Sequence, residues 1–251
     1  MEPQENTATM RIVQITDLHV GHEGQETQGV DVRANFLKVR DAVQSLNPDH
    51  LVVSGDLCFD NGEKPVYNWI KPHLDNLDIP YDIISGNHDD SVMLAQAFGL
   101  ENFLNQKELF FHKRLGNKEA LFLDTSIGEV SRTQLRWLKE KLEQLNQDLV
   151  IFMHHPPLYA AVPFMDINHS LRNKRDIQEI LFAYPHNITI FTGHYHVEKT
   201  ICKKNVVVHI TPSCFFQIDQ HSEAFKVDHH RIGLREIFYE DGTIMSTVRY
   251  L

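Results

Sequence analysis

The chain has 251 residues, 42% of them hydrophobic and 23% charged, so it can bury a large core within one domain. Its formal net charge of −10 argues against a nucleic-acid polymer as partner, because proteins that bind one usually carry a basic surface. No apolar stretch reaches membrane-spanning length, and the first ten residues lack a basic start and an apolar core. We therefore expect a cytoplasmic protein without a membrane contact, with a flexible N-terminus at 1–10 and a single domain at 11–251.

Strand-like and helical segments alternate through most of the chain. Five β-like runs are expected at 11–16, 50–54, 81–85, 149–153 and 188–192, and four further strands near 120–124, 206–211, 233–239 and 243–250. Apolar residues at spacings of four and three predict an amphipathic helix at 31–46, and another helix is expected at 172–183. Ser131 and Gln134 have the spacing of a capping box before a third helix. This order favours an α/β fold with mixed sheets.

Each of the first five β-like runs ends in a short cluster of Asp, His or Asn. The clusters are Asp17-Leu18-His19, Gly55-Asp56, Gly86-Asn87-His88-Asp89, His154-His155 and Gly193-His194-Tyr195-His196. One such cluster arises by chance in many chains, but five in order, each after an apolar run, indicate a shared site. A mixed His, Asp and Asn set suits Mn, Fe, Zn or Co. Because seven or more ligands are available, we expect two ions about 4 Å apart, bridged by a shared carboxylate.

Strand geometry gives two local expectations for these clusters. Side chains alternate along a strand, so Asp17 and His19 should point the same way, as should His194 and His196. The glycines that open three of the clusters are expected where the chain turns sharply and its backbone comes close to the site.

The five clusters resemble the ordered signature of the calcineurin-like metallophosphoesterase family, which is Asp-x-His, Gly-Asp, Gly-Asn-His-Asp/Glu, His and Gly-His-x-His. The resemblance covers about residues 11–250. The His-His-Pro-Pro block at 154–157 and the stretches at 169–173 and 211–213 are similar, more narrowly, to bacterial class III cyclic nucleotide phosphodiesterases. The resemblance implies a central mixed β-sandwich flanked by helices on both sides, which is a four-layer α/β fold.

The resemblance also implies which residues hold two divalent ions, either Mn²⁺ or an Fe/Mn pair, with Zn or Co as alternatives. The first ion would be held by Asp17, His19, Asp56 and His196, and the second by Asp56, Asn87, His154 and His194. Asp56 would then bridge the two ions. Between the adjacent His154 and His155, the family pattern favours His154 as the ligand and leaves His155 a supporting role.

His88 is expected to be catalytic without a bond to metal, either protonating the leaving oxygen or stabilising the transition state. Asp89 is expected to orient His88 or to raise its basicity. The alternative is that His88 only props the loop.

Candidate substrate contacts are His22, His169 and Arg172, and Asn61 and Phe215 are further candidates for the pocket wall. The segment 170–173 fits a helix start equally well.

The activity implied by the resemblance is hydrolysis of a small phosphodiester, above all 3′,5′-cAMP to 5′-AMP. The implied mechanism is in-line attack by a metal-bridging hydroxide. The few basic residues near the clusters suit a monoanionic diester better than a polyphosphate. Three alternatives stay open: another diesterase acting on glycerophosphodiesters or nucleotide sugars, a phosphomonoesterase with the same core, and a non-enzymatic, metal-stabilised interaction module. The sequence also allows a homodimer.

Overall fold

The computed structural model describes residues 9–240 and 242–251. The flexible N-terminus expected at 1–10 therefore lies outside the described residues, except for Thr9 and Met10. Met10 already begins the first strand, β1 (Met10–Ile15).

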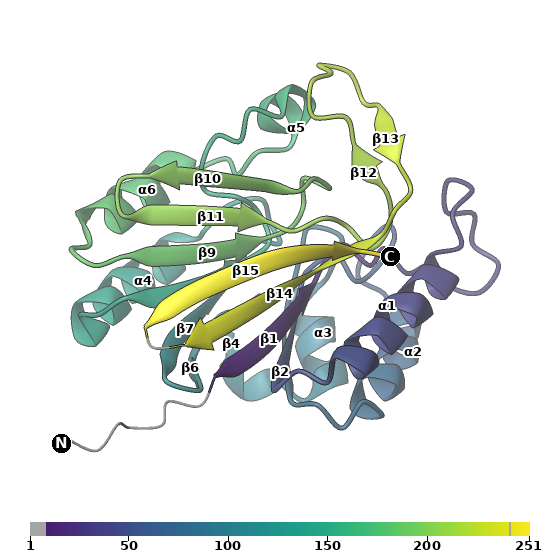
Figure 1. Cartoon of the computed structure of the whole chain (residues 1–251), viewed down its shortest axis with the longest axis horizontal. Helices are drawn as coiled ribbons and strands as arrows, with labels where there is room; N and C mark the ends of the chain where they lie inside the picture. Colours follow the sequence, from purple (N-terminus) through teal and green to yellow (C-terminus); the bar gives the residue numbers. More distant parts are fainter. Residues whose placement is uncertain (1–8, 241) are drawn as a thin grey trace.

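Two sheets face each other at the centre of the fold (Figure 1). The first has the order β15-β14-β1-β2-β3, and the second the order β10-β11-β9-β8-β7-β6. The other strands of the first sheet are β2 (His50–Ser54), β3 (Tyr81–Ile84), β14 (Gly233–Glu240) and β15 (Thr243–Tyr250). Those of the second are β6 (Phe111–Leu115), β7 (Lys118–Leu123), β8 (Leu149–Met153), β9 (Ile188–Thr192), β10 (Lys199–Lys203) and β11 (Val206–Ile210). All nine strands expected from the sequence are confirmed, within one or two residues at their ends.

Helices cover both outer faces of this sandwich (Figure 1). On one side lie α1 (Val32–Leu46), α2 (Lys64–Asp75) and α3 (Ser91–Phe98). On the other lie α4 (Arg132–Leu145) and α6 (Lys174–Ala183). The shorter elements are α5 (Pro163–Asn168), a 3₁₀ turn (Glu101–Phe103) and the small strand pairs β4 (Leu104–Asn105) with β5 (Glu108–Leu109) and β12 (Gln217–Ile218) with β13 (Val227–His229). The expected fold, a mixed β-sandwich with helices on both sides, is confirmed.

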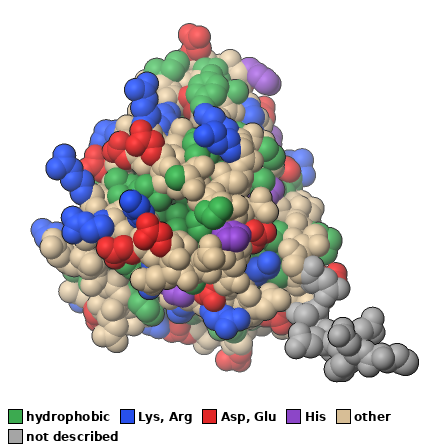
Figure 2. Space-filling model, turned by 90° about the vertical axis from the view of Figure 1, so that its left-hand side faces the viewer, with side chains coloured by type: hydrophobic (Ala, Val, Ile, Leu, Met, Phe, Trp, Pro, Cys, Tyr) green, Lys and Arg blue, Asp and Glu red, His purple; other side chains and the backbone are tan. Residues whose placement is uncertain are grey.

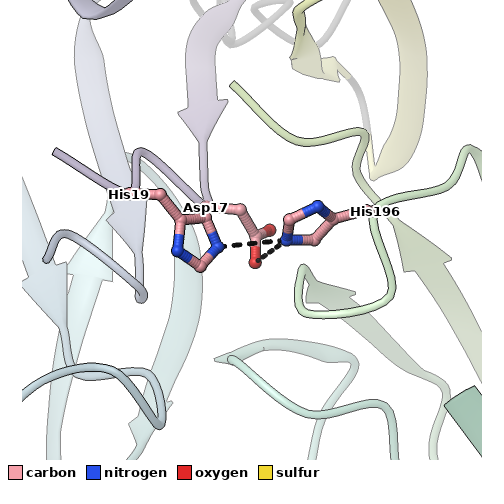
Figure 3. A group of neighbouring side chains, drawn as sticks. All are labelled: Asp17, His19 and His196. Carbon is pink, nitrogen blue, oxygen red and sulfur yellow. Dashed lines mark hydrogen bonds and ion pairs between the residues drawn. The ribbon is translucent and has the colours of Figure 1, made fainter. Parts of the chain in front are cut away.

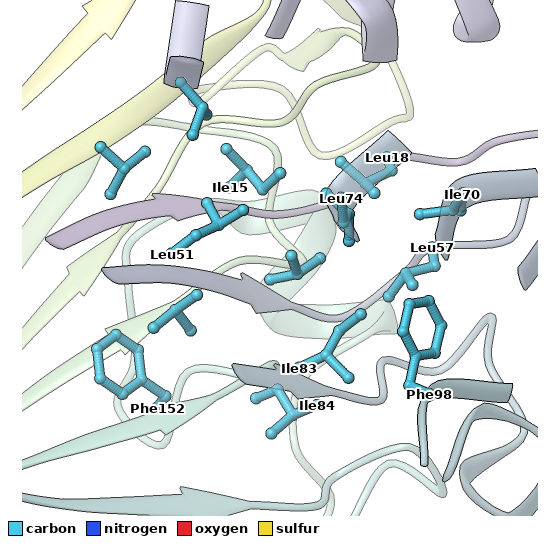
Figure 4. Close-up of a cluster of buried hydrophobic side chains, with 14 of the residues drawn as sticks. Ile15, Leu18, Leu51, Leu57, Ile70, Leu74, Ile83, Ile84, Phe98 and Phe152 are labelled. Carbon is cyan, nitrogen blue, oxygen red and sulfur yellow. The ribbon is translucent and has the colours of Figure 1, made fainter. Parts of the chain in front are cut away.

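The second sheet buries both of its faces, which explains its nearly continuous apolar strands. In β8, Val150 and Phe152 pack between the two sheets, whereas Leu149, Ile151 and Met153 pack under α4 and α6. Phe152 belongs to a ladder of stacked rings on neighbouring strands, with centroids 4.5 to 5.4 Å apart. Figure 4 shows the hydrophobic cluster around the first sheet. In it, Ile15, Leu51 and Ile83 of this sheet pack in one cluster with Ile70, Leu74 and Phe98 of α2 and α3.

Side-chain caps fix where two of the predicted helices begin. Asp31 accepts a hydrogen bond from the N–H of Ala34 at 2.9 Å and caps α1. Ser131 caps α4 by accepting from the N–H of Gln134 at 3.1 Å. The second half of the expected capping box is wrong, because the Gln134 amide instead makes two hydrogen bonds to the backbone of Asp124.

The topology brings the carboxyl ends of both sets of parallel strands to one end of the sandwich. Strands β1, β2 and β3 are parallel neighbours, and so are β7, β8 and β9. The loops that follow parallel strands lie at the same edge of a sheet, where ligand sites of α/β folds are usually found. On the face drawn in Figure 2, Lys and Arg side chains are mixed with Asp and Glu. None of the described helices is both long and apolar enough to cross a membrane.

Candidate metal centre

The structure brings the five clusters together at the carboxyl ends of β1, β2, β3, β8 and β9. One ligand atom from each of Asp17, His19 and His196 lies within 4.8 Å of the others, and Asp56, His154 and His194 form a second such group. Figure 3 shows the first group, with the Asp17 carboxylate between the two imidazoles. Each group contains three of the four residues predicted for one ion; the first lacks Asp56 and the second lacks Asn87, so the full ligand sets stay a prediction. Asp56 lies between them, because its Oδ2 is 3.1 Å from Nε2 of His154 and 3.7 Å from Nε2 of His19.

Left-handed backbone, rather than strand alternation, aims these ligands at the site. The φ angles of Asp17, His19, Asp56, His194 and His196 are 53°, 45°, 53°, 68° and 49°. We expected Asp17 and His19, and likewise His194 and His196, to point the same way because side chains alternate along a strand. That reason is wrong, because these residues do not lie in strands. Strands β1 and β9 end before these residues. Each such conformation costs of order 1 kcal/mol in a residue other than glycine, so the surrounding contacts must hold it in place.

The loops after β1 and β2 hold each other in this conformation by backbone hydrogen bonds. The N–H of Asp17 donates to the carbonyl of Gly55, and that of His19 to the carbonyl of Asp56, both at 3.0 Å. The cluster glycines allow the close approach that was expected. A Cβ on Gly86 would lie 2.2 Å from Oδ1 of Asp56, and one on Gly55 would lie 2.5 Å from Nδ1 of His154.

Backbone carbonyls fix which nitrogen of each imidazole faces the site. Nδ1 of His154 lies 2.9 Å from the carbonyl of Ser54, and Nδ1 of His196 lies 3.0 Å from that of Phe216. His194 is turned the other way, with Nε2 at 2.8 Å from the carbonyl of His169. Metal-ligating histidines usually bond through their second nitrogen in this manner. The arrangement leaves Nε2 of His154 and His196 and Nδ1 of His194 to bind ions.

The protonation states of the buried groups also fit a cation site. Burial favours the neutral carboxylic acids, but His196 and His154 outweigh it, so the pKa of Asp17 falls to about 2 and that of Asp56 well below its usual value. Burial lowers the pKa of His19 and of His194 to about 3. Burial also opposes the charged form of His154, yet Asp56 and Asp17 raise its pKa to about 9. The cluster therefore offers two ionised carboxylates and the neutral imidazoles of His19 and His194, whereas His154 must release its proton to bind a metal.

The neighbours of these ligands have distinct positions. His155 belongs to neither group, because its Nδ1 pairs with Oγ1 of Thr125 at 2.9 Å and its ring packs 4.0 Å from that of His194. The geometry thus selects His154 as the candidate ligand and gives His155 a packing role. Asn87 is exposed and lines the pocket beside the two groups.

His88 lies at the edge of the site with its backbone held by a candidate ligand. Its N–H donates to Oδ1 of Asp56 at 2.8 Å, and its ring lies edge-on to that of His19 with centroids 4.9 Å apart. A ring nitrogen of His88 also lies within 4.8 Å of ligand atoms of His19 and Asp56. Geometry alone therefore lets His88 face either an ion or a substrate, and its role without a metal bond stays a prediction.

The expected pairing of Asp89 with His88 is not what the hydrogen bonds of the described residues show. The Asp89 carboxylate accepts from the N–H groups of Gly86 and Leu57 at 2.9 and 3.2 Å, and from the Tyr67 hydroxyl at 3.1 Å. Burial and the nearby Asp56 raise its pKa to about 6. We correct the prediction accordingly: Asp89 ties the loop after β2 to the loop after β3, because the acceptor positions of its carboxylate are taken by these donors.

A pocket of about 350 Å³ opens over the two candidate ion groups. Besides the candidate ligands it is lined by Gln28, Phe59, Asp60, His88, Phe164, Met165, His169, Phe215, Phe216, Ile218 and Phe225. None of the described residues that line it is Lys or Arg. The sequence missed most of this aromatic wall, and the adjacent Phe215-Phe216 pair was its only visible signal.

Of the candidate substrate contacts, His169 and Phe215 line the pocket, whereas His22, Asn61 and Arg172 do not. His22 is exposed, with Nδ1 at 3.2 Å from the carbonyl of Glu23. The guanidinium of Arg172 donates to the carbonyl of Ile127 at 2.5 Å and lies 3.5 Å from the Glu129 carboxylate. Both side chains are engaged by nearby surface loops, so the structure does not support the expected contacts of His22 and Arg172 with substrate, and these stay a prediction.

The stretch 211–213, which the resemblance singled out, supports the centre from behind. The Ser213 hydroxyl donates to the carbonyl of Asp17 at 3.2 Å and accepts from the N–H of Phe215 at 2.8 Å. The Thr211 hydroxyl donates to Oε1 of Gln14 at 2.6 Å, and the Gln14 amide donates to Oγ of Ser54 at 2.7 Å. Ser54 in turn presents its carbonyl to His154. A buried polar network thus links both candidate ion groups.

Comparison with known proteins agrees with this geometry. Residues 10–198 match the calcineurin-like phosphoesterase family. A probable cyclic nucleotide phosphodiesterase of Fibrobacter succinogenes is 34% identical, over 86% of this chain and 84% of its own. The 3′,5′-cyclic adenosine monophosphate phosphodiesterase CpdA of Escherichia coli is 28% identical, over 99% of this chain and 92% of its own. A dimetal phosphatase from Danio rerio has the same fold, with a TM-score of 0.68, 12% identity and coverage of 95% of this chain and 98% of that one.

The central position of Asp56 leads to a prediction about metal content. Asp56→Asn should lower the bound metal from about two ions per chain to below one, because both predicted ligand sets lose their shared carboxylate. His19→Asn should remove about one ion, since only the first group contains His19. Elemental analysis after loading with Mn²⁺ and desalting measures both, with the exposed His22→Asn as the matched control. Equal metal loss in the Asp56 and His19 variants would contradict the bridging position.

The hydroxyl of Ser213 leads to a second prediction. Ser213→Ala should raise the Kd of the tighter of the two Mn²⁺ sites by about tenfold. Groups that orient metal ligands usually contribute this much or more to metal affinity. Calorimetric titration of the metal-free protein with Mn²⁺ gives the affinity, and circular dichroism checks the fold. The control is Ser45→Ala, whose hydroxyl bonds only within α1. Unchanged affinity in Ser213→Ala would show that this hydroxyl does not position Asp17.

Proposed function

We propose that this chain, which belongs to the calcineurin-like phosphoesterase family, is a metal-dependent hydrolase that converts 3′,5′-cAMP to 5′-AMP. The observation that carries the proposal is a pocket that holds two adjoining donor groups for cations but has no Lys or Arg among its described lining residues. The two relatives named above carry the names of cyclic nucleotide phosphodiesterases, which supports the same substrate class.

The charge of the pocket favours a monoanionic substrate. Dianionic monoesters and polyphosphates are usually bound through Arg or Lys in addition to metal. Since no Lys or Arg is among the described residues that line the pocket, its cationic centre would come from the ions, which offset the charges of Asp17 and Asp56. A cyclic diester bears one negative charge and therefore needs no further cation.

Two divalent ions, when bound, would supply a Lewis acid and lower the pKa of water. We assign Asp17, His19, Asp56 and His196 to one of them and Asp56, Asn87, His154 and His194 to the other. This chain's own contribution is to hold these donors in fixed directions through backbone carbonyls. Their identity, as Mn²⁺ or an Fe/Mn pair, stays a prediction, as do a cytoplasmic location, a homodimer and the single domain at 11–251.

His88 is the residue we assign to the leaving oxygen. It lines the pocket beside His19 and is fixed through its backbone to Asp56, so its ring can reach a group bound between the ion sites. A proton held on this ring would pass to the 3′ oxygen as its bond to phosphorus breaks. The non-enzymatic module is disfavoured because three candidate donors for each ion lie close together among the described residues.

Replacing His88 separates chemistry from metal binding. His88→Ala should retain the metal content of the parent protein while kcat for 3′,5′-cAMP falls by roughly 10²- to 10⁴-fold, the range for loss of a general acid or base. Metal analysis and steady-state rates are measured on the same preparation, with His22→Ala as the control. Loss of metal together with activity would make His88 a ligand instead.

The substrate itself is tested with a panel of phosphate esters under matched Mn²⁺ and pH. We expect 3′,5′-cAMP to be opened to 5′-AMP fastest, 2′,3′-cyclic nucleotides and nitrophenyl diesters more slowly, and monoesters slowest, because the pocket has no extra cation for a dianion. Chromatography of the products gives the rates, and removal of metal with a chelator should abolish them. Faster phosphate release from monoesters than opening of any cyclic diester would contradict the proposal.

A further inference from the structure

A row of aromatic rings leads from the first candidate ion group out to the surface. The ring of Phe215 lies 5.2 Å from that of His19 and 4.2 Å from that of Phe216, measured between centroids. Phe225 follows at 5.9 Å from Phe216 and 5.6 Å from Phe164. All four phenylalanines line the pocket, and Phe225 is 50% exposed. The rings are tilted by 43° to 68° to one another, so the wall beside the ion groups is apolar, presents separate ring faces and is open at its outer end.

Two short elements hold the outer rings of this row. Phe164 lies in α5, and Phe225 lies in the connection between β12 and β13. The N–H of Phe164 donates to the carbonyl of Ser222 at 3.2 Å, which joins the helix to this hairpin. Figure 1 shows α5 and the hairpin together at the same end of the molecule. An exposed aromatic ring in a fixed position beside a polar site is a typical ligand contact.

The hairpin is also anchored to the candidate metal centre. The N–H of Ile218 in β12 donates to the carbonyl of His196 at 2.9 Å. Across the hairpin, the Asp219 N–H donates to the carbonyl of Lys226 at 2.8 Å, and the two side chains form an ion pair at 2.5 Å. Phe225 precedes Lys226 and is therefore held at a set distance from the ligand loop. A group stacked on Phe225 would therefore lie at a fixed distance from the two ion sites.

We infer that Phe225 and Phe164 form the subsite for the nucleobase of the substrate and so select diesters that carry a planar aromatic group. The inference rests on the proposed function and deepens it. A purine or pyrimidine has the flat π-face that such rings stack on, and it carries no charge that the uncharged wall would have to balance. The pocket volume lies within the roughly 300–1,000 Å³ of small-molecule sites. Because stacking uses a face that every base possesses, the subsite should distinguish adenine from guanine only weakly.

The test compares 3′,5′-cAMP with the same cyclic ribose phosphate bearing a methyl group in place of the base. Phe225→Ala should raise KM for 3′,5′-cAMP by roughly fivefold to thirtyfold, since losing one stacking ring typically has an effect of this order. KM for the base-free diester should stay within about twofold of the parent value, because that substrate has nothing to stack. The Kd of 5′-AMP, measured by calorimetry on the Mn²⁺-loaded protein, should rise in parallel with KM for 3′,5′-cAMP.

Matched variants separate stacking from hairpin structure. Phe225→Trp should keep KM near the parent value, whereas Phe225→Leu, apolar but not aromatic, should behave like Phe225→Ala. Ile167→Ala removes an apolar side chain in α5 that is 68% exposed and does not line the pocket. This variant should change KM for neither of the two cyclic substrates. An equal change for both cyclic substrates, or full activity of Phe225→Leu on 3′,5′-cAMP, would overturn the inference.

Failure of the proposed function would look different. In that case the parent protein would hydrolyse no cyclic nucleotide, and the subsite is tested with bis(4-nitrophenyl) phosphate as substrate and dimethyl phosphate, which has no aromatic group, as competing ligand. If Phe225→Ala raises KM for the aromatic diester and leaves the inhibition constant of dimethyl phosphate unchanged, selection of planar groups by Phe225 is supported although the natural substrate is another diester. If both constants rise equally, the aromatic subsite is refuted.

Discussion

Two carboxylates are buried side by side in this structure, and the surrounding groups must compensate their negative charge. Asp17 and Asp56 are almost fully buried, and the charge of Asp56 opposes ionisation of Asp17, although nearby histidines hold the pKa of both carboxyl groups below its usual value. A buried anion without a partner costs several kcal/mol, so the pair is tolerable only where positive charge is supplied. In the protein without metal, protonated His154 supplies part of it, 3.1 Å from Asp56 and 3.8 Å from Asp17. Ions at the two donor groups would take over that role, which couples the stability of this end of the fold to metal binding.

The same constraint explains why so many backbone groups are committed around the site. Left-handed residues on the β1 and β2 loops are tolerated because those loops bond to each other, and Asp89 fastens the β3 loop to them. Two buried side chains support these loops from behind. Gln14 donates to Oγ of Ser54, and Ser213 donates to the carbonyl of Asp17. Each ligand is thus held by groups that touch no ion, so changes at such positions alter metal affinity without removing a ligand.

The sequence predicted the strands and the metal donors because both leave a local signal. Each donor cluster directly follows a buried strand, and parallel strands deliver their ends to one edge. The sequence did not predict where a side chain points when that direction depends on partners distant in the chain. Asp89 follows His88 and could have turned toward it, but four donors from the loops after β2 and β3 and from α2 surround its carboxylate. Arg172 was placed in the site by its neighbours in sequence, whereas its guanidinium is held by the carbonyl of Ile127.

Several elements also escaped prediction because they are short or interrupted. Helix α2 contains Pro72, although its buried Val66, Tyr67, Ile70 and Leu74 recur at helical spacing, and α5 has only six residues, too few for a full pattern. Strands β12 and β13 have two and three residues. The outer part of the aromatic wall comes from α5 and from the hairpin formed by β12 and β13, and Phe215 and Phe216 directly precede β12. Metal ligands therefore come from the regular sandwich, and the surfaces that would distinguish one diester from another come from the irregular additions. Proteins that share the sandwich and its donors can consequently differ in substrate, because a change in α5 or in this hairpin reshapes the wall while the donors stay where the parallel strands place them.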